Sequence, residues 1–97
     1  LYLEALEIYR RLAETVSRPA YEPKVADTCN NLANLYADTG RPGDAEKLYL
    51  EALEIRRRLA ETVSRPAYEP KVAGTCNNLA NLYKNTGRPD IRNKNKK

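Results

Sequence analysis

The chain has 97 residues, with 17 Lys and Arg against 13 Asp and Glu, and a formal net charge of +4. It contains no histidine, no metal-ligand spacing and no apolar run of about 18 residues, which argues against a metal centre and a transmembrane helix. Four cations and one acid lie in residues 90–97, so the basic character belongs to this end of the chain. That distribution weakens a nucleic-acid interpretation based on overall charge. The absence of methionine leads us to expect a piece of a longer protein.

Residues 1–43 return almost unchanged as residues 48–90, which gives a period of 47 residues. The two copies differ at five positions: Tyr9/Arg56, Asp27/Gly74, Ala37/Lys84, Asp38/Asn85 and Gly43/Asp90. Repetition at this spacing is typical of a stacked array, in which each unit buries its apolar face against its neighbours. Such arrays present long surfaces to partners, so the repeat favours an interaction protein over an enzyme.

Two helical patterns alternate along the chain in the order B-A-B-A. Pattern B occupies residues 1–16 and 43–63, and the buried stripe of its longer copy consists of Ala45, Leu48, Tyr49, Ala52, Ile55, Leu59 and Val63. Pattern A occupies residues 23–39 and 70–86, and its buried stripe consists of Val25, Cys29, Leu32, Ala33 and Tyr36. The periodicity therefore predicts an all-α fold with four helices.

Glycine and proline set the predicted ends of the pattern A helices. Pro23 suits a first helical turn, and Gly40 stands where a left-handed residue commonly closes a helix. The connection from A to B is short, so these two helices are predicted to be antiparallel neighbours. Residues 17–23 hold two prolines and are predicted to be a loop, which recurs at residues 64–70.

The two cysteines, Cys29 and Cys76, are equivalent positions of the repeat. Stacked helices pack roughly 10 Å apart, whereas a disulfide needs Cα atoms within about 7 Å. We therefore expect two buried free thiols. Free thiols favour a reducing compartment, and the cytoplasm is the expected location.

The motif Cys29-x2-Leu32-Ala33-x2-Tyr36, followed by Gly40 and by Ala45-x3-Tyr49-x2-Ala52-Leu53, resembles the tetratricopeptide repeat. The sequence around Asn30-Asn31-Leu32-Ala33 is most similar to the kinesin-light-chain type of this repeat. The common tetratricopeptide repeat has 34 residues, whereas the period here is 47 residues. The resemblance implies an α-solenoid of antiparallel helix pairs over residues 1–89. It divides into a partial repeat at 1–22, a full repeat at 23–69 and a partial repeat at 70–89. Residues 90–97 are predicted to be a disordered basic tail.

The resemblance implies a scaffold for protein–protein interaction, which binds an extended peptide along the concave face of the A helices. The residues expected to contact that peptide are Asn30, Asn31, Asn34, Asn77, Asn78, Asn81 and Lys84. A carboxamide can bond both the N–H and the C=O of a main chain. The alternative is that these asparagines are solvated or bond between neighbouring A helices. Three of the five differences between the copies, Asp27/Gly74, Ala37/Lys84 and Asp38/Asn85, lie on this face.

The terminal helices lack one neighbour each in the predicted order. Apolar residues are expected to be exposed at the two ends, namely Tyr2, Leu6 and Leu12 at one and Leu79 and Tyr83 at the other. The two ends are complementary, so a head-to-tail homo-oligomer is predicted. A purely structural, self-assembling segment is therefore an alternative function. Nucleic-acid binding through Arg56-Arg57-Arg58 is a weaker one, because glutamates alternate with the arginines. No enzyme activity, cofactor, metal or membrane partner is expected.

Overall fold

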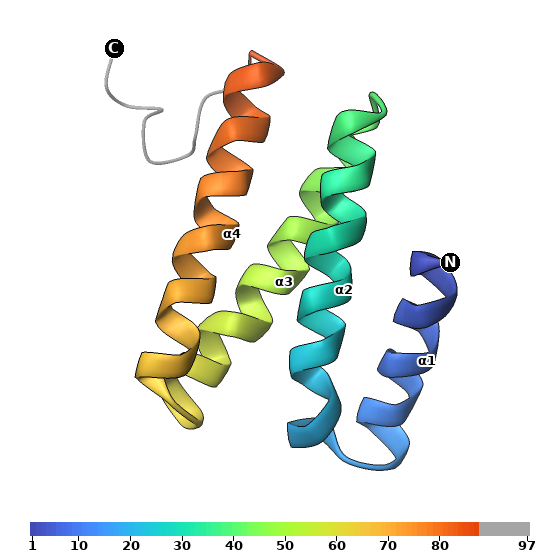
Figure 1. Ribbon diagram of the computed structural model, residues 1–97, viewed down its shortest axis with the longest axis vertical. Helices are drawn as coiled ribbons and strands as arrows, with labels where there is room; N and C mark the ends of the chain where they lie inside the picture. The colour runs from blue at the N-terminus through green and yellow to red at the C-terminus, as the bar shows by residue number, and fades with distance from the viewer. Residues whose placement is uncertain (88–97) are drawn as a thin grey trace.

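The computed structural model describes residues 1–87, which form four α-helices and no strand. They are α1 (Tyr2–Thr15), α2 (Arg18–Asp38), α3 (Pro42–Thr62) and α4 (Arg65–Asn85). Each helix packs against the next along the chain, and α2 also touches α4. Figure 1 shows α1, α2 and α4 in front, with α3 crossing behind α2 and α4. The predicted all-α fold with four helices is confirmed.

The segments predicted to be proline-rich loops belong to helices, so that prediction was wrong. Ser17 is the N-cap of α2, and its Oγ accepts the backbone N–H of Ala20 at 3.3 Å. Pro19 lies in the first turn, where a missing N–H has no consequence. Pro23 lies inside α2 and removes one backbone hydrogen bond, as Pro70 does inside α4. Ser64 caps α4 in the same way through Ala67.

The predicted helix ends are confirmed at the glycines. Gly40 has a φ of +81°, the left-handed conformation that a side chain disfavours. The N–H of Arg41 then bonds the carbonyl of Tyr36 at 2.8 Å, which closes α2 with a Schellman-type turn. The Arg41 guanidinium lies over the Tyr36 ring at 4.2 Å from its centroid. The chain therefore reverses within three residues, and α3 runs antiparallel to α2.

Two buried clusters form the core, and α2 and α3 contribute to both. The first joins α1, α2 and α3 through Leu6, Ala13, Val25, Ala26, Cys29, Leu32, Ala52, Ile55 and Leu59. The second joins α2, α3 and α4 through Ala33, Ala45, Tyr49, Leu79, Leu82 and Tyr83. The inner pair α2–α3 is therefore covered on both sides, whereas α1 and α4 are covered on one.

The two ends expose different residues from those predicted. Leu6, Leu79 and Tyr83 are buried, because their side chains face the inner neighbour of each terminal helix. Tyr2 is 43% exposed as predicted, and Leu12 is half-buried. Val63 was predicted to belong to the buried stripe of residues 43–63, but it is the C-cap of α3 and is 61% exposed. Leu48 and Tyr36 are half-buried members of their stripes.

Within residues 1–87 no helix is both long and apolar enough to cross a membrane. The predicted disordered tail at 90–97 lies outside the described residues. The helices of the second copy end 47 residues after those of the first, at Thr15 and Thr62 and at Asp38 and Asn85. The division into partial and full repeats at residues 22 and 69 stays a prediction.

Candidate functional site

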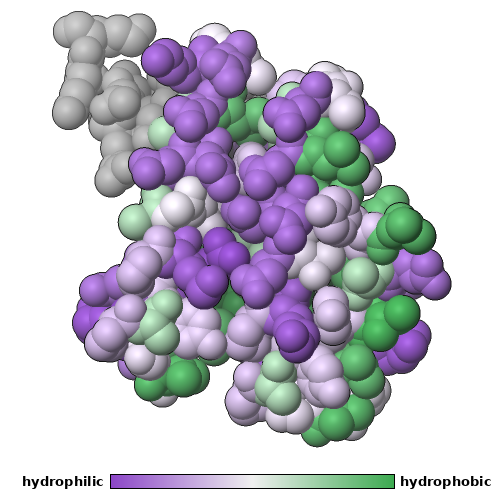
Figure 2. Space-filling view, viewed as in Figure 1, coloured by the Kyte–Doolittle hydropathy of each residue, from purple (hydrophilic) through white to green (hydrophobic). Residues whose placement is uncertain are grey.

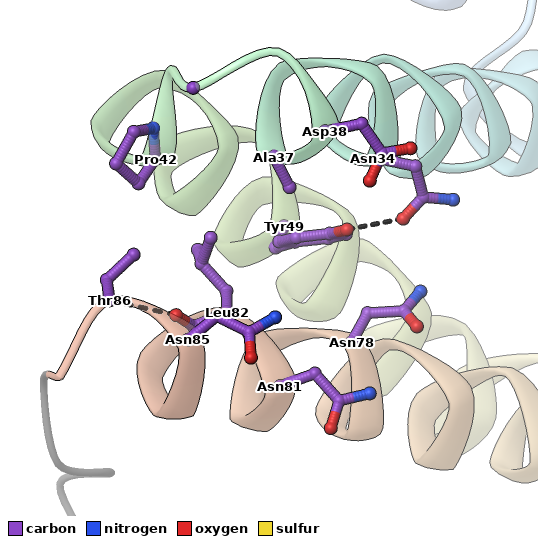
Figure 3. Close-up of a pocket in the computed structure, with 11 residues that line it drawn as sticks. Asn34, Ala37, Asp38, Pro42, Tyr49, Asn78, Asn81, Leu82, Asn85 and Thr86 are labelled. Atoms are coloured by element: carbon purple, nitrogen blue, oxygen red, sulfur yellow. Dashed lines mark hydrogen bonds between the residues drawn. The ribbon is translucent and has the colours of Figure 1, made fainter.

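A cavity of about 550 Å³ opens between α2 and α4, with α3 beneath it. Figure 3 shows side chains from all three helices around this opening. Its lining consists of Asn34, Ala37, Asp38, Gly40, Pro42, Tyr49, Asn78, Asn81, Leu82, Asn85 and Thr86. Figure 2 shows hydrophilic residues gathered over the region between these two helices. The cavity is a polar groove with an aromatic ring in its floor, and we call it the α2–α4 groove.

Tyr49 and Asn34 form a polar contact that joins α3 and α2 in the α2–α4 groove. The Tyr49 hydroxyl, which belongs to α3, donates a hydrogen bond to Oδ1 of Asn34 on α2. Burial, followed by the charge of Asp38, raises the pKa of Tyr49 above its ordinary value, so the hydroxyl keeps its proton at neutral pH. Because Oδ1 accepts this bond, the Asn34 amide nitrogen is left as a donor toward a ligand.

The groove gathers three of the seven residues predicted to bind peptide, namely Asn34, Asn78 and Asn81. Asn30 is half-buried, and its Oδ1 accepts a hydrogen bond from Nδ2 of Asn78 at 3.3 Å. The alternative of bonds between neighbouring A helices therefore holds for this pair. The remaining three, which are exposed and lie outside the groove lining, are Asn31, Asn77 and Lys84.

Sequence reasoning missed several lining residues, above all Tyr49, Leu82 and Asn85. Tyr49 and Leu82 were overlooked because their apolar parts belong to the core, so only a three-dimensional view shows their groove-facing side. The signal for Asp38 and Asn85 was present, since these equivalent positions differ between the two copies. Among residues 1–87 that line the groove, Asp38 is the only charged one, and it contributes a local negative charge.

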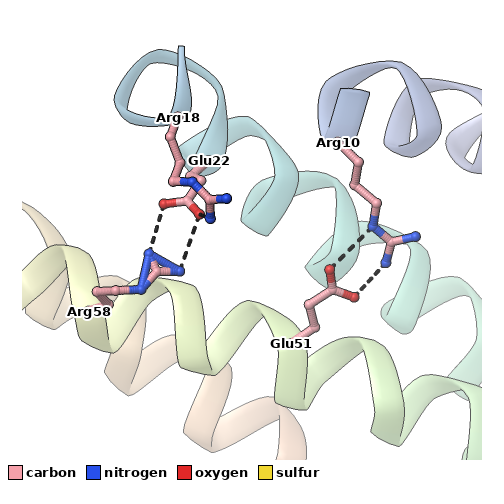
Figure 4. Close-up of polar contacts among 5 residues, drawn as sticks. All are labelled: Arg10, Arg18, Glu22, Glu51 and Arg58. Carbon is pink, nitrogen blue, oxygen red and sulfur yellow. Dashed lines mark hydrogen bonds and ion pairs between the residues drawn. The ribbon is translucent and has the colours of Figure 1, made fainter. Parts of the chain in front are cut away.

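Two arginines of the run that suggested nucleic acid, Arg56 and Arg58, are held by carboxylates. Arg58 bonds Glu22 at 2.8 and 3.3 Å, and Arg18 reaches the same carboxylate at 3.1 Å (Figure 4). Arg10 of α1 bonds Glu51 of α3 at 2.5 and 3.3 Å. Burial alone would lower the pKa of Arg10, but the hydrogen bond and charge of Glu51 outweigh it and raise that pKa. Arg58–Glu22 and Arg10–Glu51 connect different helices, whereas Arg18–Glu22 lies within α2. All three pairs leave less positive charge for phosphates.

Arg56 of α3 is buried and bonds residues of both α2 and α4. Its Nη2 bonds Asp27 of α2 at 2.8 Å, and its Nη1 bonds the Thr75 hydroxyl of α4 at 2.7 Å. Nε has no hydrogen-bond partner among residues 1–87. Arg56 and Asp27 occupy two of the five positions that differ between the copies, where Tyr9 and Gly74 stand instead. The two differences therefore meet in one ion pair.

The described residues offer little for catalysis or metal binding. Within residues 1–87 no group of three His, Cys, Asp or Glu side chains could hold a metal ion. Cys29 is a free thiol, and burial, followed by the charge of Glu51, raises its pKa to about 12. A thiol in this state is a poor nucleophile at neutral pH. Cys76 is a free thiol that is only half-buried, which corrects the prediction that both cysteines are buried.

The comparison with protein families agrees with this architecture. Residues 25–63, which cover most of α2 and all of α3, match the family model of the tetratricopeptide repeat. No curated protein and no solved structure gave a significant match. The inner helix pair is thus a tetratricopeptide-type repeat, and the described fold is an all-α helical repeat of that type. Tetratricopeptide repeats generally mediate protein–protein interactions.

Proposed function

We propose that this chain is a protein-interaction scaffold that binds an extended segment of a partner in the α2–α4 groove. The observation that carries the proposal is the convergence of three asparagines. Asn34 comes from α2, and Asn78 and Asn81 come from α4, yet all three line one cavity of about 550 Å³. Asparagine is unfavourable inside a helix, and a shared binding role accounts for its use there.

The chemistry of this groove suits a peptide main chain. A carboxamide offers donors and acceptors, so it can bond main-chain N–H and C=O groups whatever side chains the partner has. Asn34 presents its amide N–H groups, because Tyr49 occupies its oxygen. Asn81 is exposed and offers both kinds of group. Asp38 adds a preference for a partner segment with a basic side chain nearby.

We also propose a subtype for the repeat and a cellular location for the chain. A 47-residue unit of the kinesin-light-chain-like type is supported by the 47-residue period and by the spacing of the Asn-Asn-Leu-Ala motif. A cytoplasmic location is supported by two cysteines that remain free thiols. The assignment to the kinesin-light-chain-like type can be tested by comparing the flanking copies of the repeat with a family model of that subtype.

Selection from a displayed random-peptide library, followed by affinity measurements, tests the groove. Replacement of Asn34 and Asn81 by alanine is expected to weaken the selected peptide by at least about tenfold, because two hydrogen bonds are lost. The matched control replaces Asn31 and Asn77 by alanine, since these exposed residues lie outside the lining. Circular dichroism verifies that both double variants keep their helices.

Two outcomes would contradict the proposal. An Asn34→Ala, Asn81→Ala chain that keeps both its helices and its affinity would exclude these carboxamides as ligand contacts. An equal loss in the control pair would place the partner elsewhere on the A helices.

A further inference from the structure

The terminal helices expose the faces that the inner helices use against each other. Ile55 is 7% exposed on α3, whereas its equivalent Ile8 is 38% exposed on α1. On the other side, Ala26 of α2 is 1% exposed, whereas its equivalent Ala73 is exposed on α4. The exposed face of α1 therefore corresponds to the face of α3 that packs on α2. The exposed face of α4 corresponds to the face of α2 that packs on α3.

The polar partners of the inner contact are also present at the two ends. Arg58 bonds Glu22 across α3 and α2, and a shift of 47 residues gives Arg11 on α1 and Glu69 on α4, both exposed. Glu69 already accepts a bond from Arg65 at 3.1 Å, as Glu22 does from Arg18 at 3.1 Å. The carboxylate at the open end is therefore held as in the inner copy.

The positions that differ between the copies preserve this complementarity. The inner Arg56–Asp27 ion pair becomes Tyr9 on α1 and Gly74 on α4. Neither end then carries an unmatched charge at this position. The space beside Gly74 is open, since a Cβ placed there would meet nothing within 4 Å, so it can receive a ring. A buried contact with one charged member would be unfavourable, and this exchange avoids it.

We propose that the open face of α4 in one copy of this chain docks the open face of α1 in a second copy, in the geometry of the inner α2–α3 contact. Apolar side chains meet as Ile8 against Ala73, and Arg11 pairs with Glu69. The proposal accounts for the exposure of Tyr2 and Ile8 on α1, because their equivalents on α3, Tyr49 and Ile55, are 3% and 7% exposed. Figure 2 shows hydrophobic surface along the edge where α1 lies. The docking does not depend on any groove ligand.

The docking joins two different faces, so it repeats from copy to copy. A docked pair keeps one open α1 face on one copy and one open α4 face on the other, so the assembly grows until it closes or the concentration limits it. The mass measured by sedimentation is therefore expected to rise steadily with concentration, with no plateau at the dimer.

Two blocking variants test this arrangement. Ile8→Arg places a charge on the open face of α1, and Ala73→Arg places one on the open face of α4. Both positions are exposed, so the helices are expected to form normally. Each variant alone is expected to associate at least about a hundredfold more weakly, because the arginine would be buried without a partner. An equimolar mixture of the two is expected to give a 1:1 dimer, since one unblocked face of each kind remains.

Val16→Arg provides the matched control on α1. Val16 is 66% exposed, and its equivalent Val63 stays 61% exposed in the inner copy, so this position lies outside the contact. The control is expected to associate like the original chain. A chain that stays monomeric at millimolar concentration would overturn the proposal. Association of Ile8→Arg at the original strength, or a mixture that stays monomeric with intact helices, would overturn it as well.

Charge reversal tests the pairing itself. Arg11→Glu and Glu69→Arg are each expected to weaken association by about fivefold, which is the scale of an exposed ion pair. The chain with both substitutions is expected to regain the original association, because the reversed charges meet between copies. No recovery would contradict the proposed register of α1 on α4.

Discussion

The inner helix pair and the two outer helices have almost the same sequence in different surroundings. Tyr49 is 3% exposed on α3, whereas the identical position on α1, Tyr2, is 43% exposed. Cys29 is fully buried on α2, and Cys76 is half-buried on α4. The side chains are the same, so the neighbouring helix is what buries them.

Local features, by contrast, are the same in both copies. Ser17 and Ser64 cap their helices with identical 3.3 Å hydrogen bonds, and both glycines after α2 and α4 have positive φ. Helix boundaries therefore follow from nearby residues, whereas core burial follows from the stack.

The largest difference is expected in the reactivity of the two thiols. A pKa of about 12 for Cys29, against an ordinary value of 9.0, leaves roughly a thousandfold less thiolate at pH 8. Reaction with a disulfide reagent at low protein concentration is expected to show one fast thiol, Cys76, and one that reacts only when the chain opens. A Cys76→Ser variant identifies the fast phase. Two equally fast thiols would contradict the different burial of the copies.

The same shift predicts a pH dependence of stability. The Cys29 pKa is higher in the folded state than its ordinary value, so the neutral thiol is the form that folding favours. This contribution is complete below about pH 9 and is lost as pH rises toward 12. Urea unfolding between pH 8 and 11 is expected to show a steeper loss of stability for the original chain than for Cys29→Ala. Parallel curves would exclude this contribution.

Isoleucine truncation compares the two environments directly. Ile55→Ala removes side-chain volume from the inner core and is expected to lower the free energy of unfolding by about 2–5 kcal/mol. The equivalent Ile8→Ala acts at a 38% exposed site, and its effect is expected to stay under about 1 kcal/mol. Urea titration followed by circular dichroism measures both. Equal losses would mean that burial differs less between the copies than the structure indicates.

The Arg56–Asp27 ion pair is expected to have an intermediate effect. Asp27→Ala leaves the buried Arg56 guanidinium with Thr75 as its remaining hydrogen-bond partner among the described residues, at an expected loss of about 1–2 kcal/mol. Solvent reduces this figure, because the Asp27 side chain is 52% exposed. The control is the double variant Arg56→Tyr, Asp27→Gly, which carries the residues found at the equivalent positions Tyr9 and Gly74. A double-mutant cycle is expected to give a coupling of about 1 kcal/mol. Strict additivity would show that the two differences are independent.

The smallest contrast is expected at the helix caps. Ser17→Ala and Ser64→Ala each remove one capping hydrogen bond and are expected to lower the unfolding free energy by about 1 kcal/mol. Because the local geometry is identical, the two losses should agree within about 0.5 kcal/mol. Thermal or urea unfolding of the two variants measures them. A large difference would show that even the caps depend on the stack.

Periodicity and glycine positions were sufficient to predict the helices, their order and their antiparallel turns. The prolines misled the prediction at residues 17–23, because a serine cap and a first-turn proline allow a helix to begin earlier than two prolines suggest. The open faces were misassigned for a related reason. A shift of one residue around a helix separates Leu79, which faces α3, from Ala80, which is exposed.

The groove could be predicted only in part. Its asparagines follow from the pattern of α2 and α4, whereas Tyr49 belongs to a core stripe in the sequence and meets Asn34 only after the helices pack. The burial of Arg56 could not be predicted from the sequence either. It stands in a run of three arginines that suggests an exposed basic patch, yet its side chain is buried between Asp27 and Thr75. Contacts between helices that are distant in the sequence decide both cases.

Hydrogen exchange of backbone amides, measured at a concentration where the chain is monomeric, tests most directly whether neighbours determine stability. The slowest exchange is expected in α2 and α3, which are covered on both sides, with faster exchange in α1 and α4. Equal protection across the four helices, or slowest exchange in a terminal helix, would contradict the account.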